Sequence, residues 1–138
     1  MDSSYVVFEN VKKSYDNKKL VVKDFNLKVK KGEFLTMLGP SGSGKTTCLM
    51  MLAGFESITS GQISLKGEAI NDIAPHKRNI GVVFQNYALF PHMTIAENLA
   101  YPLKIRKMDK KIIKEKVNKT LSLVELLDFE NRYPGQLS

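Results

Sequence analysis

The nine residues GPSGSGKTT, Gly39 to Thr47, constrain the fold of this chain more than any other stretch. The short apolar run EFLTMLG, Glu33 to Gly39, leads into them and is typical of a buried strand. No helix breaker follows between Lys45 and Ala53, and Gly54 is well suited to end a helix. The pattern therefore predicts a buried strand, a glycine-rich loop and a helix in direct succession.

This loop has the chemistry of a nucleoside triphosphate site. The glycines at 42 and 44 permit backbone angles that turn successive N–H groups inward, and the helix N-terminus adds unpaired donors and a partial positive charge. Lys45 reaches the β- and γ-phosphates with a full charge, while Thr46 offers a hydroxyl to Mg²⁺. A glycine-rich turn that binds nothing is the alternative. The residues expected to bind ATP here are Ser41, Gly42, Ser43, Gly44, Lys45, Thr46 and Thr47.

Short β-branched, aromatic or alternating runs predict further strands on both sides of this helix. One lies near Tyr5–Val11 and one over NLKVKKG, while TSGQISLKGEAI reads as a strand, a turn and the start of another strand. The run NIGVVFQ, Asn79 to Gln85, has the Val and Ile content of a buried strand. Strands that alternate with helices indicate an α/β fold.

The last third of the chain is predicted to be helical. After a break at Pro91, Thr94 and Glu97 have the spacing of a capping box. The helix that they begin is expected to reach about Tyr101 and to stop before Pro102.

A second helix is expected to start at an Asp109 cap and to run to about Leu127. One face of it carries four apolar residues, Ile113, Val117, Leu121 and Val124. These elements divide the chain into a β-subdomain with a P-loop core, residues 1–88, and a helical subdomain, residues 89–138.

Composition narrows the class of protein. The chain has 138 residues, of which 43% are hydrophobic, and this fits a globular domain rather than a disordered segment. No apolar run approaches the roughly 20 residues that span a bilayer. The single Cys48 forms no internal disulfide and is expected to pack in the core.

The net charge of +7 raises the possibility of a nucleic-acid partner. Lysines supply nearly all of this charge, and aromatic residues are not interleaved with them for stacking on bases. The densest basic run, KIRKMDKKIIKEKVNK, contains an apolar helical stripe and is best interpreted as a solvated helix face. We therefore expect no nucleic-acid partner.

Hydrolysis of ATP needs an acidic group as well, usually on a second strand. The run LSLVELLDFE is the sole candidate, and its spacing fits the end of a helix better than a strand. Glu125, Asp128 and Glu130 are therefore expected at the surface, and no catalytic residue is assigned within this chain.

Four segments in order, GPSGSGKTT, LAGFESITSGQISLKG, RNIGVVFQNYALFPHMTIAENLAYPL and YPGQLS, give the chain a clear resemblance. Over its whole length it resembles the nucleotide-binding subunit of ABC transporters. The resemblance implies an α/β P-loop NTPase fold with ATP and Mg²⁺ as cofactors. It also implies that Tyr15 stacks on adenine and that Val21 packs beside the nucleoside, although the residues alone favour Tyr15 as a strand-end core residue.

The resemblance assigns Gln85 to a flexible loop, where its amide oxygen would approach Mg²⁺ and the attacking water. An exposed glutamine at a strand end is the alternative. The segment NYALFPHMT resembles the surface that docks a membrane-spanning permease subunit, and Tyr87, Leu89 and Phe90 would form its apolar contact. Packing within the helical subdomain is the alternative for these three, and His92 is interpreted as a docking or surface residue.

Leu137 and Ser138 match the start of the family's signature motif LSGGQ, which caps ATP on the other subunit of a head-to-tail homodimer. In the family the acidic strand with its catalytic Glu follows this motif. The resemblance thus implies a fragment that binds ATP without turnover, with an unpaired strand edge that lowers stability or drives self-association.

For the parent protein the resemblance implies an importer ATPase, a translocase, bound to permease subunits at the cytoplasmic face of the membrane. Polyamine (spermidine or putrescine) is the first choice of cargo, with iron(III) and sugar as other options. Two alternative functions stay open: a non-catalytic ATP-binding remnant, and a soluble ABC-type protein that acts on nucleic acid.

Overall fold

A computed structural model describes residues 4–86 and 88–137. The chain forms two compact units, Met1–Val82 and Val83–Ser138. Each unit is described by itself below. The subdomain boundary expected at residues 88 and 89 stays a prediction.

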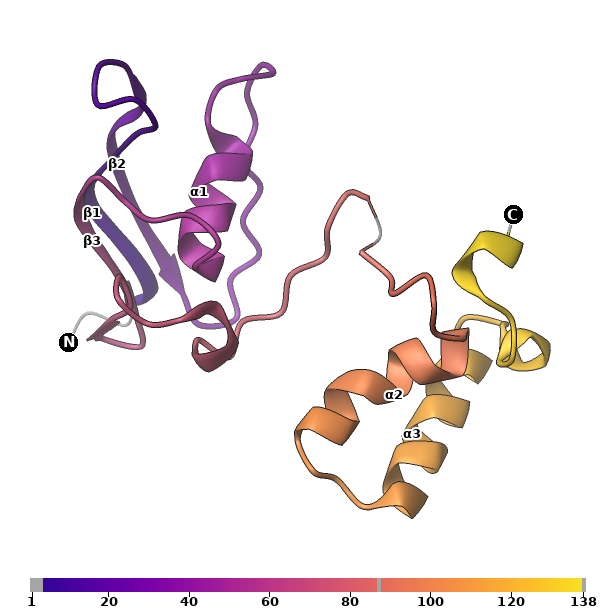
Figure 1. Cartoon of the computed structure of the whole chain (residues 1–138). Coiled ribbons are helices and arrows are strands. Elements are labelled where there is room, and N and C mark those ends of the chain that lie inside the picture. Colours follow the sequence, from indigo (N-terminus) through magenta and orange to yellow (C-terminus); the bar gives the residue numbers. More distant parts are fainter. Residues whose placement is uncertain (1–3, 87, 138) are drawn as a thin grey trace. The chain divides into compact units, whose positions relative to one another are not determined.

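The first unit is built on a four-stranded antiparallel sheet with the order β2-β1-β3-β4 (Figure 1). The strands are β1 (Ser4–Ser14), β2 (Leu20–Lys30), β3 (Ser60–Leu65) and β4 (Glu68–Ala69). These confirm the strands predicted from the alternating runs, although β2 begins well before the run NLKVKKG. A short 3-10 helix, η1 (Pro75–Lys77), follows the sheet.

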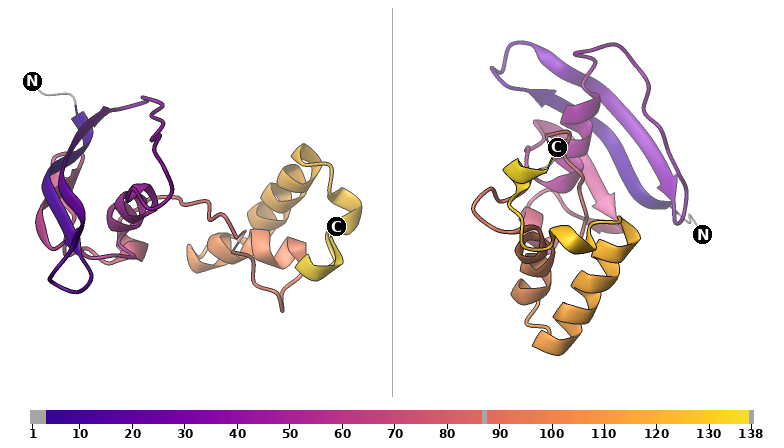
Figure 2. Two further views of the ribbon diagram at one scale, coloured as in Figure 1. Left: turned by 90° about the horizontal axis from the view of Figure 1, so that it is seen from above. Right: turned by 90° about the vertical axis from the view of Figure 1, so that its right-hand side faces the viewer.

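Helix α1 (Lys45–Ala53) lies against one face of this sheet (Figures 1 and 2). It ends as predicted at Gly54, whose φ of 87° is left-handed and whose N–H donates to Met50 O and Met51 O. Met51 is 1% exposed, and burying such a side chain stabilises a fold by about 1.5–3 kcal/mol. The core between helix and sheet consists of Phe8, Val11, Val22, Cys48, Met51, Ile63 and Ile70.

The prediction of two buried strands is wrong for the segments Glu33 to Gly39 and Asn79 to Gln85. Both segments lack strand pairing, and Phe34 and Val83 are 93% and 99% exposed. A strand is stable only when a neighbour takes up its backbone hydrogen bonds, and no strand among the described residues pairs with either segment. A short apolar run is thus not sufficient to form a strand.

The second unit contains helices α2 (Ile95–Ile105) and α3 (Lys110–Leu123), followed by the 3-10 helices η2 (Leu127–Phe129) and η3 (Pro134–Gln136) (Figures 1 and 2). The predicted capping box is confirmed: Glu97 N–H donates to Thr94 Oγ1 at 3.2 Å, and Thr94 N–H donates to Glu97 Oε2 at 2.8 Å. The core between the helices consists of Ile95, Ala100, Ile113, Val117 and Leu121.

Two helix ends differ from the prediction. Helix α2 continues through Pro102, because proline keeps a helical φ and because Leu103, the next residue, packs on the core of this unit. Helix α3 ends at Leu123 rather than Leu127, so Val124 leaves the buried stripe and is 55% exposed.

Candidate functional site

The glycine-rich loop presents its backbone at the start of α1. Gly42 and Gly44 both have left-handed φ angles, 77° and 86°. Gly44 is the N-cap of α1, where no side chain accepts a hydrogen bond, and the first turn contains no acidic residue. The N–H groups of this turn and the positive end of the helix dipole are therefore available to an anionic ligand.

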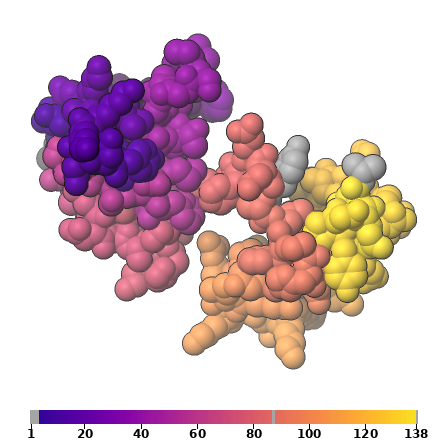
Figure 3. Space-filling model, turned by 45° about the horizontal axis from the view of Figure 1, so that its top comes forward, coloured from indigo at the N-terminus to yellow at the C-terminus, as the bar shows by residue number. Residues whose placement is uncertain are grey.

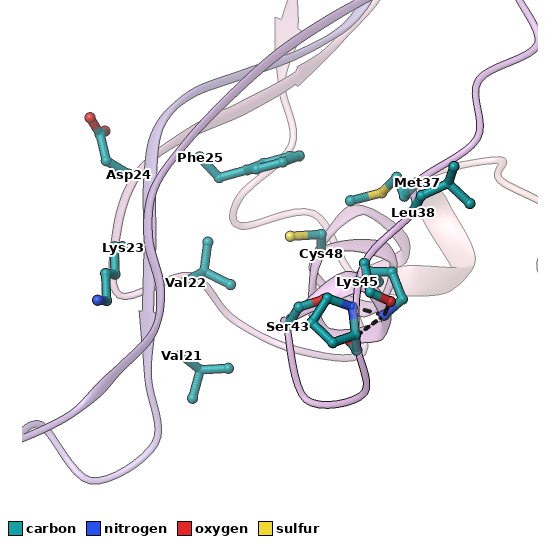
Figure 4. Close-up of a pocket in the computed structure, with 13 residues that line it drawn as sticks. Val21, Val22, Lys23, Asp24, Phe25, Met37, Leu38, Ser43, Lys45 and Cys48 are labelled. Carbon is teal, nitrogen blue, oxygen red and sulfur yellow. Dashed lines mark hydrogen bonds between the residues drawn. The ribbon is translucent and has the colours of Figure 1, made fainter.

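Lys45 folds back over the loop. Its ammonium donates to Gly39 O at 2.7 Å, to Pro40 O at 2.7 Å and to Ser43 Oγ at 3.2 Å (Figure 4). These bonds keep the charge within the loop, beside the N-terminus of α1.

A pocket of about 390 Å³ separates this loop from β2, and its wall includes Ser43, Gly44 and Lys45. From β2, Val21 and Val22 point toward the loop (Figure 4). A Cβ on Gly44 would lie 3.2 Å from Val22 Cγ2, so the loop and β2 approach closely here. The structure thus brings Val21 next to the glycine-rich loop, and its contact with a nucleoside stays a prediction.

Cys48 also lines the pocket, from the first turns of α1, and is 4% exposed. The expectation that it packs in the core is confirmed. Burial raises the pKa of the Cys48 thiol, so the thiol stays protonated at neutral pH.

The remaining loop residues lie at the surface or close to it. Ser41 and Thr46 are exposed and Thr47 is half-buried. No group of three or more His, Cys, Asp or Glu side chains gathers within residues 4–86 and 88–137.

Tyr15 stands in the turn between β1 and β2 and is 60% exposed, so it is not a core residue. It is not one of the residues that line the pocket beside the loop. Asp16 shapes the turn by accepting from the N–H groups of Lys18 and Lys19, both at 2.9 Å, and these bonds lower its pKa. Beneath the ring lies the ammonium of Lys13, a residue that sequence reasoning did not select.

Gln85 belongs to the second unit, where it is exposed in a turn. Leu89 and Phe90 are 47% and 39% exposed, and the exposed stretch 88–92 lies on the surface of this unit (Figure 3). Asn98 ties the stretch to α2: its Oδ1 accepts from Phe90 N–H at 2.8 Å and its amide donates to Phe90 O at 3.1 Å. The Phe90 ring also packs on Tyr101, with centroids 4.7 Å apart.

The other predicted residues of the second unit are Leu137, Tyr87 and Ser138. Leu137 packs on the helical core and its N–H donates to Pro134 O. Tyr87 and Ser138 lie outside the described residues.

A family model described as ABC transporter matches residues 22–138. The chain belongs to the ABC transporter family. Its fold is that of the family's ATPase cassette: a dimeric structure of the ATP-binding cassette MJ0796, in a post-hydrolysis state bound to ADP and Pi, is similar with a TM-score of 0.85. That match has 32% identity and covers 96% of this chain and 63% of the other.

Curated relatives are import ATP-binding proteins. The spermidine/putrescine protein PotA of Acetivibrio thermocellus is 51% identical over all of this chain and 39% of its own length. The trehalose protein SugC of Mycobacterium tuberculosis is 47% identical over 96% of this chain and 34% of its own length. The sn-glycerol-3-phosphate protein UgpC of Brucella abortus is 49% identical over 98% and 38%.

This ABC family chain thus spans about two fifths of the length of these curated relatives. In the part of the chain that the structure describes, no helix is long and apolar enough to cross a membrane.

Proposed function

We propose that this chain is the ATP-binding part of an ABC importer ATPase. The observation that carries the proposal is the loop at the start of α1, where uncapped N–H groups and the Lys45 ammonium lie beside a pocket that Val21 lines. The phosphates of ATP would accept hydrogen bonds from the loop N–H groups and from the Lys45 ammonium. The nucleoside would lie along Val21. Tyr15, exposed at the β1–β2 turn, would stack on adenine.

The donors on this chain suit Mg²⁺ bound together with the nucleotide. The Thr46 hydroxyl is a hard oxygen ligand at the loop, and Gln85 would add an amide oxygen. When bound, Mg²⁺ neutralises charge on the phosphates. The role of this chain's residues is to bind and orient the nucleotide.

The parent protein would work as a homodimer on permease subunits at the cytoplasmic face of the membrane. The exposed stretch around Leu89 and Phe90 is the candidate permease contact, and Leu137 would begin the motif that faces the partner's ATP. Polyamine is the proposed cargo, because spermidine/putrescine proteins are among the most similar relatives. Trehalose and glycerol-phosphate proteins have nearly the same identity, so transport assays should compare all three cargoes.

The test is ATP binding by the purified chain and by Lys45→Ala, with Lys31→Ala as the control at an exposed lysine. We expect micromolar binding of MgATP by the wild type and by Lys31→Ala, and no measurable binding by Lys45→Ala. Equal binding by all three would contradict the assignment of the loop.

We also propose that the chain alone does not hydrolyse ATP, because its sequence offers no strand with the acidic group that hydrolysis needs. Phosphate release measured on the same samples tests this. A Lys45-dependent rate of about 1 per second, within the ordinary enzyme range, would refute it.

A further inference from the structure

Lys13 is a charged side chain buried inside the first unit, two residues before Tyr15. Only 6% of it is exposed. Its ammonium donates to Ser57 O at 2.7 Å and lies 3.0 Å from Glu56 Oε2. A buried ammonium is tolerated where its charge and its protons are matched, and these two contacts do both.

The same ammonium lies 4.7 Å from the centroid of the Tyr15 ring, within the range of a cation–π contact. Tyr15 is nevertheless 60% exposed. An exposed aromatic side chain ordinarily moves among several rotamers. A fixed cation against the ring restricts that motion, while most of the ring surface stays accessible to a planar ligand.

Lys13 also connects the ring to the helix that carries the phosphate loop. Glu56 lies just after α1, and its N–H donates to Met50 O at 3.2 Å, which holds it against the end of that helix. Helix α1 begins at Lys45. The contacts from Tyr15 through Lys13 and Glu56 therefore lead to the same rigid element that presents the phosphate-binding donors.

We propose that Lys13 is the positioning residue for the adenine platform. Held by Glu56, its ammonium fixes the Tyr15 ring relative to the phosphate loop, so that one ligand can meet both. Lys13 acts through Tyr15 and is not itself a catalytic residue. The inference rests on the proposed function, because it assumes a nucleotide whose base lies on Tyr15.

The experiment compares two ligands on the purified chain: MgATP and magnesium tripolyphosphate, which has the phosphates but no base. Lys13→Met should weaken ATP binding about fivefold, as expected for loss of a partly desolvated cation–π contact, and should leave tripolyphosphate binding unchanged. Lys13→Arg should restore most of the loss, because the cation is kept. Lys12→Met, the same change at the exposed neighbouring lysine, is the matched control and should bind both ligands like the wild type.

A second comparison tests whether Lys13 acts through the ring. In a Tyr15→Ala background, Lys13→Met should cause no further loss of ATP affinity. Should Lys13→Met alone fail to fold, Lys13→Met/Glu56→Gln removes the unpaired carboxylate and is measured in its place.

The outcomes separate this inference from the function on which it rests. If Lys13→Met binds ATP like Lys12→Met, or loses affinity for both ligands equally, the positioning role is overturned while ATP binding stands. If the wild-type chain binds neither ligand, the proposed function itself is overturned.

Discussion

At Gly44 the backbone conformation and the close approach of β2 both disfavour a side chain. Its φ of 86° is left-handed, and a Cβ would lie 3.2 Å from Val22 Cγ2 and 3.4 Å from Val21 O. Glycine is required here both for the backbone angle and for the close approach to β2. A methyl group at this position would press on Val22 at the edge of the pocket.

The burial of Cys48 makes the stability of the fold decrease at high pH. Burial raises the pKa of its thiol above the unfolded value, so the folded chain keeps the proton to higher pH than the unfolded chain does. This contribution to stability is complete below the unfolded pKa of about 8.5 and is lost as the pH rises through the folded value. We expect the urea midpoint to fall more between pH 7.5 and about 10 for the wild type than for Cys48→Ala.

The matched measurement is alkylation of the native chain by iodoacetamide at pH 8. It should be far slower than alkylation of the chain in urea, because the native thiol is buried and protonated. Parallel stability curves for the two proteins, or equal alkylation rates, would contradict the assignment.

Some residues of the site were predictable from sequence and others were not. The loop residues share one short motif, so their arrangement follows from local chain geometry. Lys13 lies two residues from the buried Val11 on the same strand, and this period of two predicts that its side chain faces inward. Its partners Glu56 and Ser57 lie more than 40 residues away, and no local pattern pairs them with it.

At the scale of elements, Arg78 closes the C-terminal end of α1. It is 6% exposed, and its guanidinium donates to four carbonyl oxygens, those of Met51, Leu52, Asn71 and Ile73, at 2.7–3.1 Å. A cation at this end also complements the helix dipole. One side chain thus satisfies carbonyl groups from α1 and from the segment after β4.

Replacing this guanidinium should be costly. Arg78→Met keeps the length of the side chain but leaves those carbonyls without donors, and we expect the free energy of unfolding to fall by about 3 kcal/mol. Arg78→Lys should lie between, because an ammonium lacks the planar fork. Denaturation by urea measures both, with exposed Arg106→Met as a control that should change stability by less than about 0.5 kcal/mol. Equal stability of the two methionine variants would contradict this account of α1.

Elements that depend on short-range signals were predicted well. The capping box at Thr94 and the end of α1 at Gly54 each need only a few neighbouring residues. The segments before Gly39 and before Gln85 have equally apolar sequences, yet they form no strand, because strand formation depends on a partner that is not local. At Pro102 the prediction failed in the opposite direction, because a helix was expected to stop there and instead continues. The packing of Leu103 outweighs the local preference of proline against helix.

At the scale of the whole molecule, the two segments that form no strand leave apolar side chains in contact with water. Phe34 and Leu38 in the first unit are 93% and 90% exposed, and Val83 in the second is 99% exposed. Extended backbone next to exposed apolar side chains is the usual template for edge-to-edge association. We expect these exposed side chains to lower the stability of the 138-residue chain.

We therefore expect the purified chain to self-associate at micromolar concentration. Sedimentation velocity should show dimers or larger species, and the change Phe34→Ser with Leu38→Ser should shift them toward monomer. Leu123→Ser, at a 75% exposed position on α3, is the control and should leave the distribution unchanged. A single stable species of 15.5 kDa would count against the prediction.

The bonds of Lys45 have a consequence for the energetics of ligand capture. All three ammonium protons have acceptors within the loop itself, in Gly39, Pro40 and Ser43. If the proposed function holds, a phosphate would replace these acceptors, and the heat of binding would be the difference between two sets of similar bonds. The loop therefore supplies its own acceptors for the Lys45 charge, and a ligand would have to compete with them.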